Sequence, residues 1–331
     1  MDRSTMTEDF PAIRRTGIGG RPRLAPGVYT DIPEAEYHAD PFAQISLSSG
    51  VAKLLISQSP RHAWTAHPRL NPEYVAPDRK QFDLGSAAHA ILLDDRPERV
   101  AVIDAADYRT KAAKEARAAA VEDGRLPLLE DQYGRTMEMV RAARSQLAKN
   151  NDGKVFLEGG SSEITLGWMD HNVMCRARID RLSADGTIIF DYKTTAASAH
   201  PDAYRRTSIS LQQSFQAAFY LRGFKECFPC MPPPQWRWIV QEDYPPYALS
   251  VLAPDAAALD IAYNDVDLAL SIWRECIRDG DWPCYPSVTA TLETPPWEIT
   301  RAETIKSKLG GRGAHDPQAI RDLIYNWQAP I

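Results

Sequence analysis

The pattern of apolar and polar positions divides the chain into a helical first part and a later part that begins with strands. Two short segments, 47–60 and 82–94, are predicted to be helices; the first starts with a serine pair that can act as N-cap, and the second is rich in small residues. A longer Ala-, Arg-, Lys- and Glu-rich stretch, 107–150, also predicts helix, with a break at 124–127 where glycine and proline occur.

From residue 161 the apolar positions alternate with polar ones, which is typical of strands. Segments 161–170 and 171–182 are predicted to pair as a hairpin, with Asn172 near the turn. A third strand, 186–195, follows a turn signal at 183–186. Three consecutive strands in this order indicate a sheet at the centre of the fold.

The remaining segments return to mixed helical and strand patterns. Residues 208–228 form a strongly amphipathic stretch that predicts one long helix, ended by Pro229. Segments 235–243 and 247–254 predict a second hairpin, and 255–280 predicts a closing helix. This order of elements predicts a mixed α/β fold with one central sheet.

Composition adds limits to this picture. The 331 residues are ample for a buried core, and 44% hydrophobic and 25% charged residues are ordinary for a globular protein. No apolar run approaches the roughly 20 residues that span a bilayer, so no membrane partner is expected, and the N-terminus lacks the apolar region of a signal peptide. Five irregularly spaced cysteines indicate a reduced, cytosolic compartment.

The charge distribution leaves nucleic-acid binding open. The net charge of −6 argues mildly against it, because proteins that bind nucleic acids tend to be basic. Two segments, 108–117 and 306–313, are nevertheless basic. Each is also explained by an ordinary solvated surface, so charge alone does not decide between the two interpretations.

The third predicted strand carries the most informative chemistry. Its apolar part runs directly into Asp191, Tyr192 and Lys193, and residues two apart on a strand project to one face, about 6.6 Å apart. Asp180 lies near the end of the preceding strand, so pairing of the two strands would bring Asp180 close to Asp191. Two adjacent carboxylates favour a cation between them, and oxygen ligands suit Mg²⁺ or Mn²⁺. A lysine beside such a metal can orient or deprotonate an attacking water, as phosphodiester hydrolysis requires.

Each of these features has a simpler explanation when it is taken alone. Asp191 and Lys193 could be a plain ion pair at a strand end. Gln212, Gln216 and Tyr220 have the spacing of one helical face and could bind phosphate or brace a carboxylate, or could be solvated polar residues. His89, among apolar residues, could be a metal ligand or an ordinary core histidine.

The ordered set of these residues resembles the PD-(D/E)XK nuclease superfamily, in its RecB-type branch. The order is His89, then Asp180, then the Asp191–Lys193 triplet, then Gln216 through Tyr220. The segments "GVYTDIPEAEYHAD", "SLSSGVAKLL", "SSEITLGWMD" and "RARIDRL" are further similar to the exonuclease VIII (RecE-type) nuclease domain of phages and prophages.

The resemblance implies a restriction-endonuclease-like core and a Mg²⁺-dependent exonuclease, with Mn²⁺ as a substitute. Such an enzyme digests one strand of linear duplex DNA from 5′ to 3′ and leaves a 3′ overhang, in a bacterial or phage-infected cell. The implied partners are double-stranded DNA ends, a RecT-like single-strand annealing protein, and further copies of the chain in a ring.

The resemblance also implies a role for each site residue. The implied metal ligands are His89, Asp180, Asp191 and the backbone carbonyl of Tyr192. The implied catalytic set is Asp180, Asp191, Lys193, Glu163, Gln216 and Tyr220, in which Lys193 positions the water. The implied DNA contacts are Gln212, Gln216, Tyr220 and Arg178. Glu163 remains open between a metal ligand, a group behind the ligands and a surface charge.

Some related nucleases bind an iron–sulfur cluster through four cysteines. Here only Cys227 and Cys230 are closely spaced, so we expect packing cysteines and no cluster. The predicted organisation is a flexible tail over 1–26, a nuclease domain over 27–297, and an extension over 298–331 that holds a basic loop and a short helix. A non-catalytic DNA-end or partner-binding protein of the same fold, an endonuclease and an RNA nuclease remain alternatives.

Overall fold

The computed structural model describes residues 14–15, 23–30, 32–75, 84–94, 97–309 and 315–325. The chain divides into two compact units, Met1–Cys284 and Tyr285–Ile331. Most of the predicted N-terminal tail and the end of the basic loop lie outside the described residues, and the predicted division at residue 297 stays a prediction. No helix in the described ranges combines the length and the apolar character that crossing a membrane requires.

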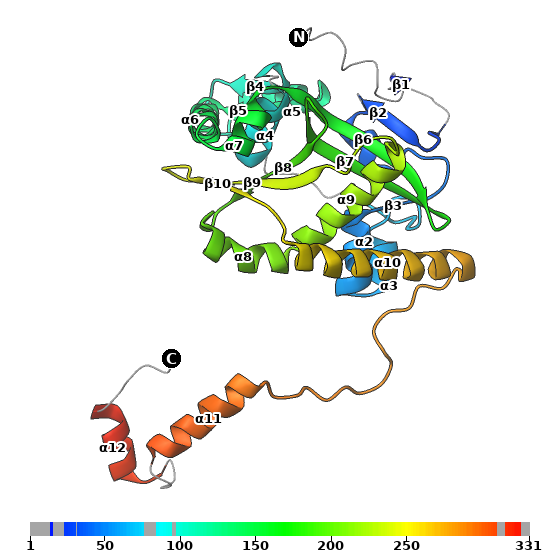
Figure 1. The fold of residues 1–331 in the computed structure, drawn as a ribbon. Coiled ribbons are helices and arrows are strands. Elements are labelled where there is room, and N and C mark those ends of the chain that lie inside the picture. Colours follow the sequence, from blue (N-terminus) through cyan, green and yellow to red (C-terminus); the bar gives the residue numbers. More distant parts are fainter. Residues whose placement is uncertain are drawn as a thin grey trace. The chain divides into compact units, whose positions relative to one another are not determined.

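One mixed sheet lies at the centre of the first unit (Figure 1). Its strands follow the order β1, β2, β6, β7, β8, β9, β10, and β3 pairs beside β7. Neighbours β6, β7 and β8 are antiparallel, whereas β8 and β9 are parallel. The strands are β1 Arg14–Arg15, β2 Gly27–Thr30, β3 Ser46–Ser48, β6 Gly160–Asp170, β7 Val173–Ser183, β8 Ile188–Thr195, β9 Gln235–Glu242 and β10 Leu249–Leu252.

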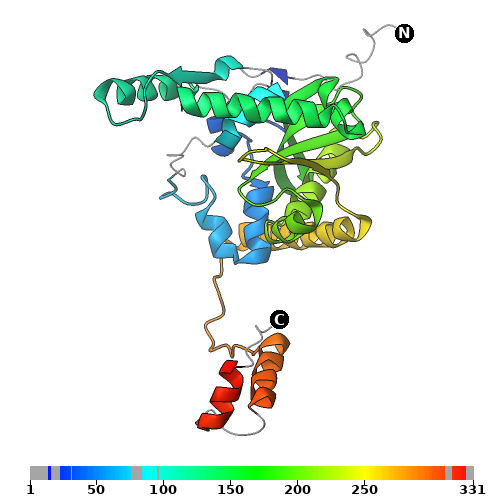
Figure 2. The ribbon, with the colours of Figure 1, turned by 90° about the vertical axis from the view of Figure 1, so that its left-hand side faces the viewer.

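Helices cover both faces of this sheet, as the views in Figures 1 and 2 show. One face packs on α2 Ser49–Ser57, α3 Pro60–Thr65, α8 Pro201–Ser210, α9 Gln213–Cys227 and α10 Ala256–Asp279. The other carries α4 Leu84–Asp94, α5 Lys111–Glu122, α6 Glu130–Leu147 and α7 Asn151–Leu157, with a small parallel pair, β4 Val100–Ile103 and β5 Leu126–Leu129. A separate apolar core fills each side. The predicted α/β fold with a central mixed sheet and flanking helices is confirmed.

Both predicted hairpins are confirmed. Strands β6 and β7 pair up to Asp170 and Val173, so only His171 and Asn172 form the turn. Both turn residues have positive φ, 45° and 65°, which a two-residue turn between twisted strands requires and which asparagine tolerates well. Strands β9 and β10 form the second antiparallel pair.

The prediction of one helix over 208–228 was wrong. Helix α8 ends at Ser210 and α9 begins at Gln213, because Gln212 between them adopts the left-handed conformation, with φ 49° and ψ 48°. The side chain of Gln213 is buried and donates a hydrogen bond of 2.6 Å to the hydroxyl of Tyr204 on α8. This contact holds the two helices at an elbow instead of in one line.

The break in the 107–150 stretch also contains more than a loop. Residues 126–129 form β5, which pairs in parallel with β4. The stretch therefore contains helix α5, strand β5 and helix α6 instead of a helix with a simple break. Pro127 is tolerated in β5 because the two-stranded pair leaves one edge of the strand without a ladder partner.

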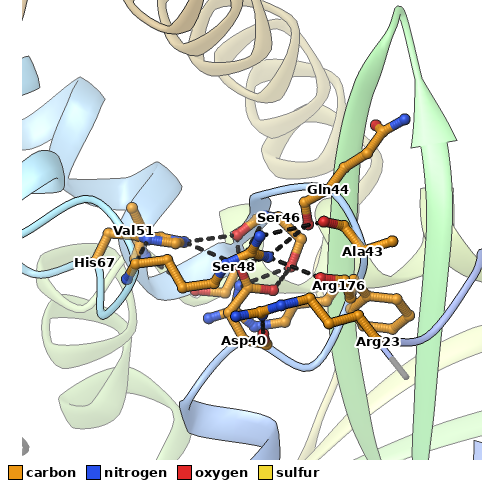
Figure 3. A network of polar contacts seen from close by, with 11 residues as sticks. Arg23, Asp40, Ala43, Gln44, Ser46, Ser48, Val51, His67 and Arg176 are labelled. Carbon is orange, nitrogen blue, oxygen red and sulfur yellow. Dashed lines mark hydrogen bonds and ion pairs between the residues drawn. The ribbon is translucent and has the colours of Figure 1, made fainter. Parts of the chain in front are cut away.

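A buried polar network ties β3 to β7 and fixes the start of α2 (Figure 3). Asp40 accepts hydrogen bonds from the backbone N–H and hydroxyl of Ser46 and from Arg69, while Arg176 donates to the Ser46 carbonyl. His67 completes the network through its Nε2, 3.1 Å from the same carbonyl. Since β3 runs directly into α2, the network positions that helix against the sheet.

In the described part of the second compact unit, two helices, α11 Pro296–Lys308 and α12 Pro317–Tyr325, lie side by side (Figure 2). Helix α12 is the predicted short C-terminal helix. Asp316 caps it, because its side chain accepts a hydrogen bond from the N–H of Ala319 at 3.1 Å. The short helix α1, Glu34–His38, belongs to the first unit.

Candidate active site

The site forms where strands β7 and β8 part. They pair only through Arg181 with Phe190 and Leu182 with Ile189, whereas β8 keeps its parallel pairing with β9 along its whole length. Beyond the last pair, Asp180 takes the place of a ladder bond: its Oδ2 accepts a hydrogen bond of 3.1 Å from the N–H of Tyr192. The divergence therefore places the carboxylate of Asp180 against the backbone of the Asp191–Lys193 triplet.

Asp191 and Lys193 share one face of β8, as predicted. The Lys193 Nζ lies 2.9 Å from Oδ1 and 2.8 Å from Oδ2 of Asp191, and Gln216 donates to the same Oδ1 at 3.0 Å. Asp191 is only 1% exposed. Burial raises its pKa to about 6, because the nearby charge of Asp180 adds to the desolvation cost and Lys193 offsets only part of it.

The other two charged groups are held in their ionised forms. Burial alone would raise the pKa of Asp180, but His89, Lys193 and the Tyr192 N–H together lower it. Burial alone would lower the pKa of Lys193, but the two aspartates raise it. Lys193 is therefore a protonated ammonium that can orient a water or offset negative charge, and not a group ready to accept a proton.

Helix α4 brings His89 to the carboxylates. Its Nε2 lies 3.3 Å from Oδ2 of Asp180 and its Nδ1 lies 3.9 Å from Oε1 of Glu163. The helix approaches β8 so closely at Gly85 that a Cβ there would lie 2.4 Å from Oγ1 of Thr194. The small residues of this helix thus permit the predicted close packing, and they place His89 beside the two acids; its role as a metal ligand stays a prediction.

Glu163 reaches the site through an irregularity in β6. Pairing with β7 is interrupted at Glu163 and at Asp180 opposite it, with the same register on either side, and Glu163 has a positive φ of 57°. A non-glycine residue in this conformation costs energy that neighbouring contacts must offset. Its Oε2 accepts a hydrogen bond of 3.1 Å from Arg178. Glu163 therefore faces the site and is not a surface charge of the hairpin.

Arg178 is itself held by several groups. Besides Glu163, it donates to the carbonyl of Ile32 at 2.6 Å, and its guanidinium stacks 4.5 Å from the ring centre of Tyr37. These contacts fix the guanidinium at the wall of the site. Its predicted contact with DNA stays a prediction.

The predicted polar stripe on one helix is only partly present. Gln216 bonds Asp191, and Tyr220 lies one turn further along α9, 8% exposed, with its ring edge against Trp236. Burial raises the pKa of Tyr220 well above its usual value. Gln212 does not belong to the stripe, because it is the left-handed residue before α9.

A cavity of about 450 Å³ opens at these groups. Its lining includes His89, Glu163, Arg178, Asp180, Lys193 and Tyr220. Charged and hydrogen-bonding groups dominate this set, so the cavity suits a polar ligand far better than an apolar one.

The donor set fits a hard divalent cation. Within the described residues, no three His, Cys, Asp or Glu side chains already form a complete ligand group. Mg²⁺ does not need one, because it usually keeps several waters and binds through one or two carboxylates. The buried Oδ2 of Asp191 accepts no hydrogen bond in the described structure, although Lys193 lies beside it. Asp180, Asp191, the Tyr192 carbonyl and His89 are the groups that would hold the cation.

Sequence reasoning missed two residues of the surroundings. Tyr37 lies beside Arg178 and lines the cavity, and Lys53 lies on α2 close enough to Asp191 and Lys193 for their charges to interact. Both come from segments that supported the family resemblance, but neither stands in a motif of its own. The one sequence feature that could have pointed to Lys53 is its spacing, one helical turn after Ser49.

Comparison with known proteins identifies the class. The family model of the PD-(D/E)XK nuclease superfamily matches residues 46–280, which is more than half of the chain, so the chain belongs to this superfamily. Among solved structures, an Eubacterium rectale protein provisionally described as an exonuclease matches with a TM-score of 0.50 and 9% sequence identity, over 81% of this chain and 95% of that one. No curated protein matches the chain. The structural match confirms the restriction-endonuclease-like fold.

Members of this superfamily generally use divalent metal ions, which agrees with the oxygen donors described above. The five cysteines are free; Cys175 and Cys276 are buried, and Cys230 and Cys284 are exposed. The expectation that they hold no iron–sulfur cluster stays a prediction.

Proposed function

We propose that this chain is a Mg²⁺-dependent exodeoxyribonuclease that degrades linear double-stranded DNA from 5′ to 3′ and leaves 3′ overhangs. The observation that carries the proposal is the convergence of Asp180, Asp191 and Lys193 at the point where β7 and β8 part. Two acids and a protonated lysine at one strand end are the groups that phosphodiester hydrolysis requires. All positions of the superfamily motif are filled, which favours an enzyme over a non-catalytic binding protein.

A bound divalent cation supplies Lewis acidity and lowers the pKa of a coordinated water. The chain's own residues account for the rest of the chemistry. Asp180 and Asp191 offer the anionic oxygens, and Gln216 fixes the orientation of Asp191. Lys193, protonated between them, is suited to hold the attacking water in line and to offset charge on the scissile phosphate.

The proposal that DNA ends are the substrate is supported by two similarities to other proteins. The segments that resemble the RecE-type exonuclease span most of the first compact unit, and the matched Eubacterium rectale protein has a provisional description as an exonuclease. On the same basis, the proposed partners are a RecT-like annealing protein, which would load on the overhang, and further copies of the chain in a ring.

A digestion series with Mg²⁺ tests the proposal. Equal masses of linear duplex, nicked circle, covalently closed circle, single strand and duplex RNA are incubated with excess enzyme at low salt. We expect linear duplex DNA to disappear while closed circles and RNA survive. Release of label from the 5′ end before the 3′ end would support the proposed polarity.

Matched variants make the result specific. Lys193→Met removes the ammonium of the site, whereas Lys225→Met removes an exposed lysine at the far end of α9. Only the first is expected to stop digestion. Loss of closed circles as fast as linear DNA would indicate an endonuclease with the same site. Absence of cleavage of every substrate would favour the non-catalytic alternative.

A further inference from the structure

Lys53 lies beside the proposed active site on an element that supplies none of its predicted residues. It follows Ser49 by one turn of α2, so the two side chains share a helical face, and Ser49 lies against Tyr220. The Lys53 Nζ donates a hydrogen bond of 2.9 Å to the carbonyl of Leu211, at the elbow between α8 and α9. Lys53 therefore extends along the side of the site from which Gln216 reaches Asp191.

The electrostatic setting of Lys53 is unusual for a lysine. Burial and the positive charge of Lys193 lower its pKa to about 8, and the attraction of Asp191 offsets only part of this. Within the residues that the structure describes, its ammonium has the Leu211 carbonyl as its polar contact and no carboxylate at ion-pairing distance. A second cation thus lies within electrostatic reach of Lys193, and no carboxylate among the described residues pairs with it.

Such an arrangement costs free energy in the isolated protein. A partly desolvated ammonium loses hydration, and a like charge nearby adds repulsion. Asp191, the acid whose negative charge attracts Lys53, already contacts Lys193 and Gln216. Both costs are offset when an anion binds between or beside the two lysines, and unfavourable charge placement of this kind is typical of functional sites.

We propose that Lys53 is a substrate-binding residue that contacts the backbone phosphate next to the scissile phosphate. Lys193 and Lys53 would then hold consecutive phosphates of one DNA strand. This inference rests on the proposed function, because it takes the anion to be the nucleic-acid backbone. It adds a DNA contact on α2 to those on α9 and β7.

A purely structural role is the competing explanation. In that case the hydrogen bond to Leu211 would only hold the α8–α9 elbow, and thereby Gln216, in place. Loss of the lysine would then lower kcat through a misplaced Asp191, while DNA affinity and its dependence on salt would stay unchanged. A phosphate contact changes affinity and salt dependence instead.

The test compares Lys53→Met, Lys53→Arg and the control Lys225→Met. Affinity for a short labelled DNA duplex is measured by fluorescence anisotropy in EDTA over a series of salt concentrations, and KM and kcat are measured with Mg²⁺. Loss of one charge-assisted phosphate contact is expected to weaken binding about ten- to a hundredfold in Lys53→Met. The slope of log affinity against log salt should fall by about 0.9.

Lys53→Arg, which keeps the charge, should restore most of the affinity, and Lys225→Met should behave as wild type. Wild-type affinity and slope in Lys53→Met, with or without a lower kcat, would overturn the proposal while leaving the nuclease assignment intact. If the wild-type protein cleaves no nucleic acid but Lys53→Met still loses affinity and slope, the proposed function fails and the phosphate contact stands.

Discussion

At the scale of single residues, the three charged groups at the strand ends have different tasks. Asp180 accepts the Tyr192 N–H and lies against His89, and Lys193 bridges to Asp191. We expect Asp180→Asn, Asp191→Asn and Lys193→Met each to lower DNA cleavage by a hundredfold to a thousandfold or more, roughly the effect of removing one preorganised charge from a catalytic site. Removal of divalent metal by EDTA should abolish cleavage, and restored Mg²⁺ should recover it.

The same aspartates should differ in their effect on stability. Because burial raises the pKa of Asp191 to about 6, its ionised form is disfavoured in the folded protein at neutral pH. Asp191→Asn is therefore expected to raise the Tm of the metal-free protein at pH 7.5. Asp180→Asn is not, because the pKa of Asp180 is lowered and its negative charge is stabilising. Calorimetry of both variants in EDTA checks this; a lower Tm for Asp191→Asn would contradict it.

A second residue, His67, should make the protein less stable at acid pH. The buried ring of His67 receives a hydrogen bond on Nδ1 from the Arg69 N–H, so its Nε2–H donates to the Ser46 carbonyl and the neutral form is satisfied. Burial and the charge of Arg176 lower its pKa to about 4. Since the unfolded chain takes up this proton at a higher pH than the folded one, stability is lost as pH falls from 6.5 towards 4, by about 3 kcal/mol.

The measurement is urea unfolding of wild type and His67→Gln between pH 4 and 7.5. The glutamine amide can replace the Nε2–H donor but does not titrate. The variant should be less stable at pH 7.5, because His67 also packs against Trp273, and the difference should shrink as the pH falls. A constant difference over the whole range would show that His67 does not control the acid response.

How far the sequence predicts the site is clearest at this scale. Strand geometry fixes Asp191 and Lys193 on one face, so their contact followed from spacing alone. The positive φ of Glu163 and the contact of Lys53 with Leu211, 158 residues away, depend on tertiary packing. No local sequence pattern predicts such contacts. The role of Glu163 was therefore left undecided from the sequence, and Lys53 was not predicted.

At the scale of elements, α4 positions His89 through its close approach to β8. A Cβ at Gly85 would lie 2.4 Å from Oγ1 and 3.2 Å from Cβ of Thr194, so Gly85→Ala must displace Thr194 or the helix itself. We expect a loss of about 1–3 kcal/mol in stability, as for other overpacked sites, together with reduced cleavage because His89 moves away from Asp180. Chemical denaturation and the linear-DNA assay measure the two effects.

Gly134→Ala is the matched control. Gly134 lies within α6 and a Cβ there meets nothing within 4 Å, so alanine should raise stability slightly through its better helix propensity. If Gly85→Ala were as stable and as active as this control, the close approach of α4 would not position the site.

Elements were predicted well where periodicity is strong and poorly where a turn depends on buried partners. Both hairpins follow from alternation, with Asn172 at the first turn, and the helix predicted over 255–280 is observed as Ala256–Asp279. The elbow before α9 depends on the Gln213–Tyr204 hydrogen bond, which no propensity encodes. An amphipathic pattern that continues across such an elbow looks like one helix.

At the scale of the whole molecule, the net charge of −6 conflicts with a broad electrostatic grip on DNA. Positive charge must then be concentrated where the DNA strand passes. The two lysines of the site, Lys53 and Lys193, would supply part of this charge. A protein that holds DNA weakly from outside can still stay on its substrate if several copies enclose it. We therefore expect a homo-oligomer, with a solution mass that is a whole multiple of 37.0 kDa by light scattering.

The functional consequence of an enclosing ring is processivity. When labelled linear duplex is digested and a large excess of unlabelled duplex is added, an oligomer that encloses its strand should finish the labelled molecules before it turns to the competitor. A monomer with an open site should dissociate, and the more readily at higher salt, because each phosphate contact lowers log affinity by about 0.9 per tenfold increase in salt. A monomeric mass together with immediate inhibition by the competitor would contradict the ring, while the roles of Asp180, Asp191 and Lys193 would be unaffected.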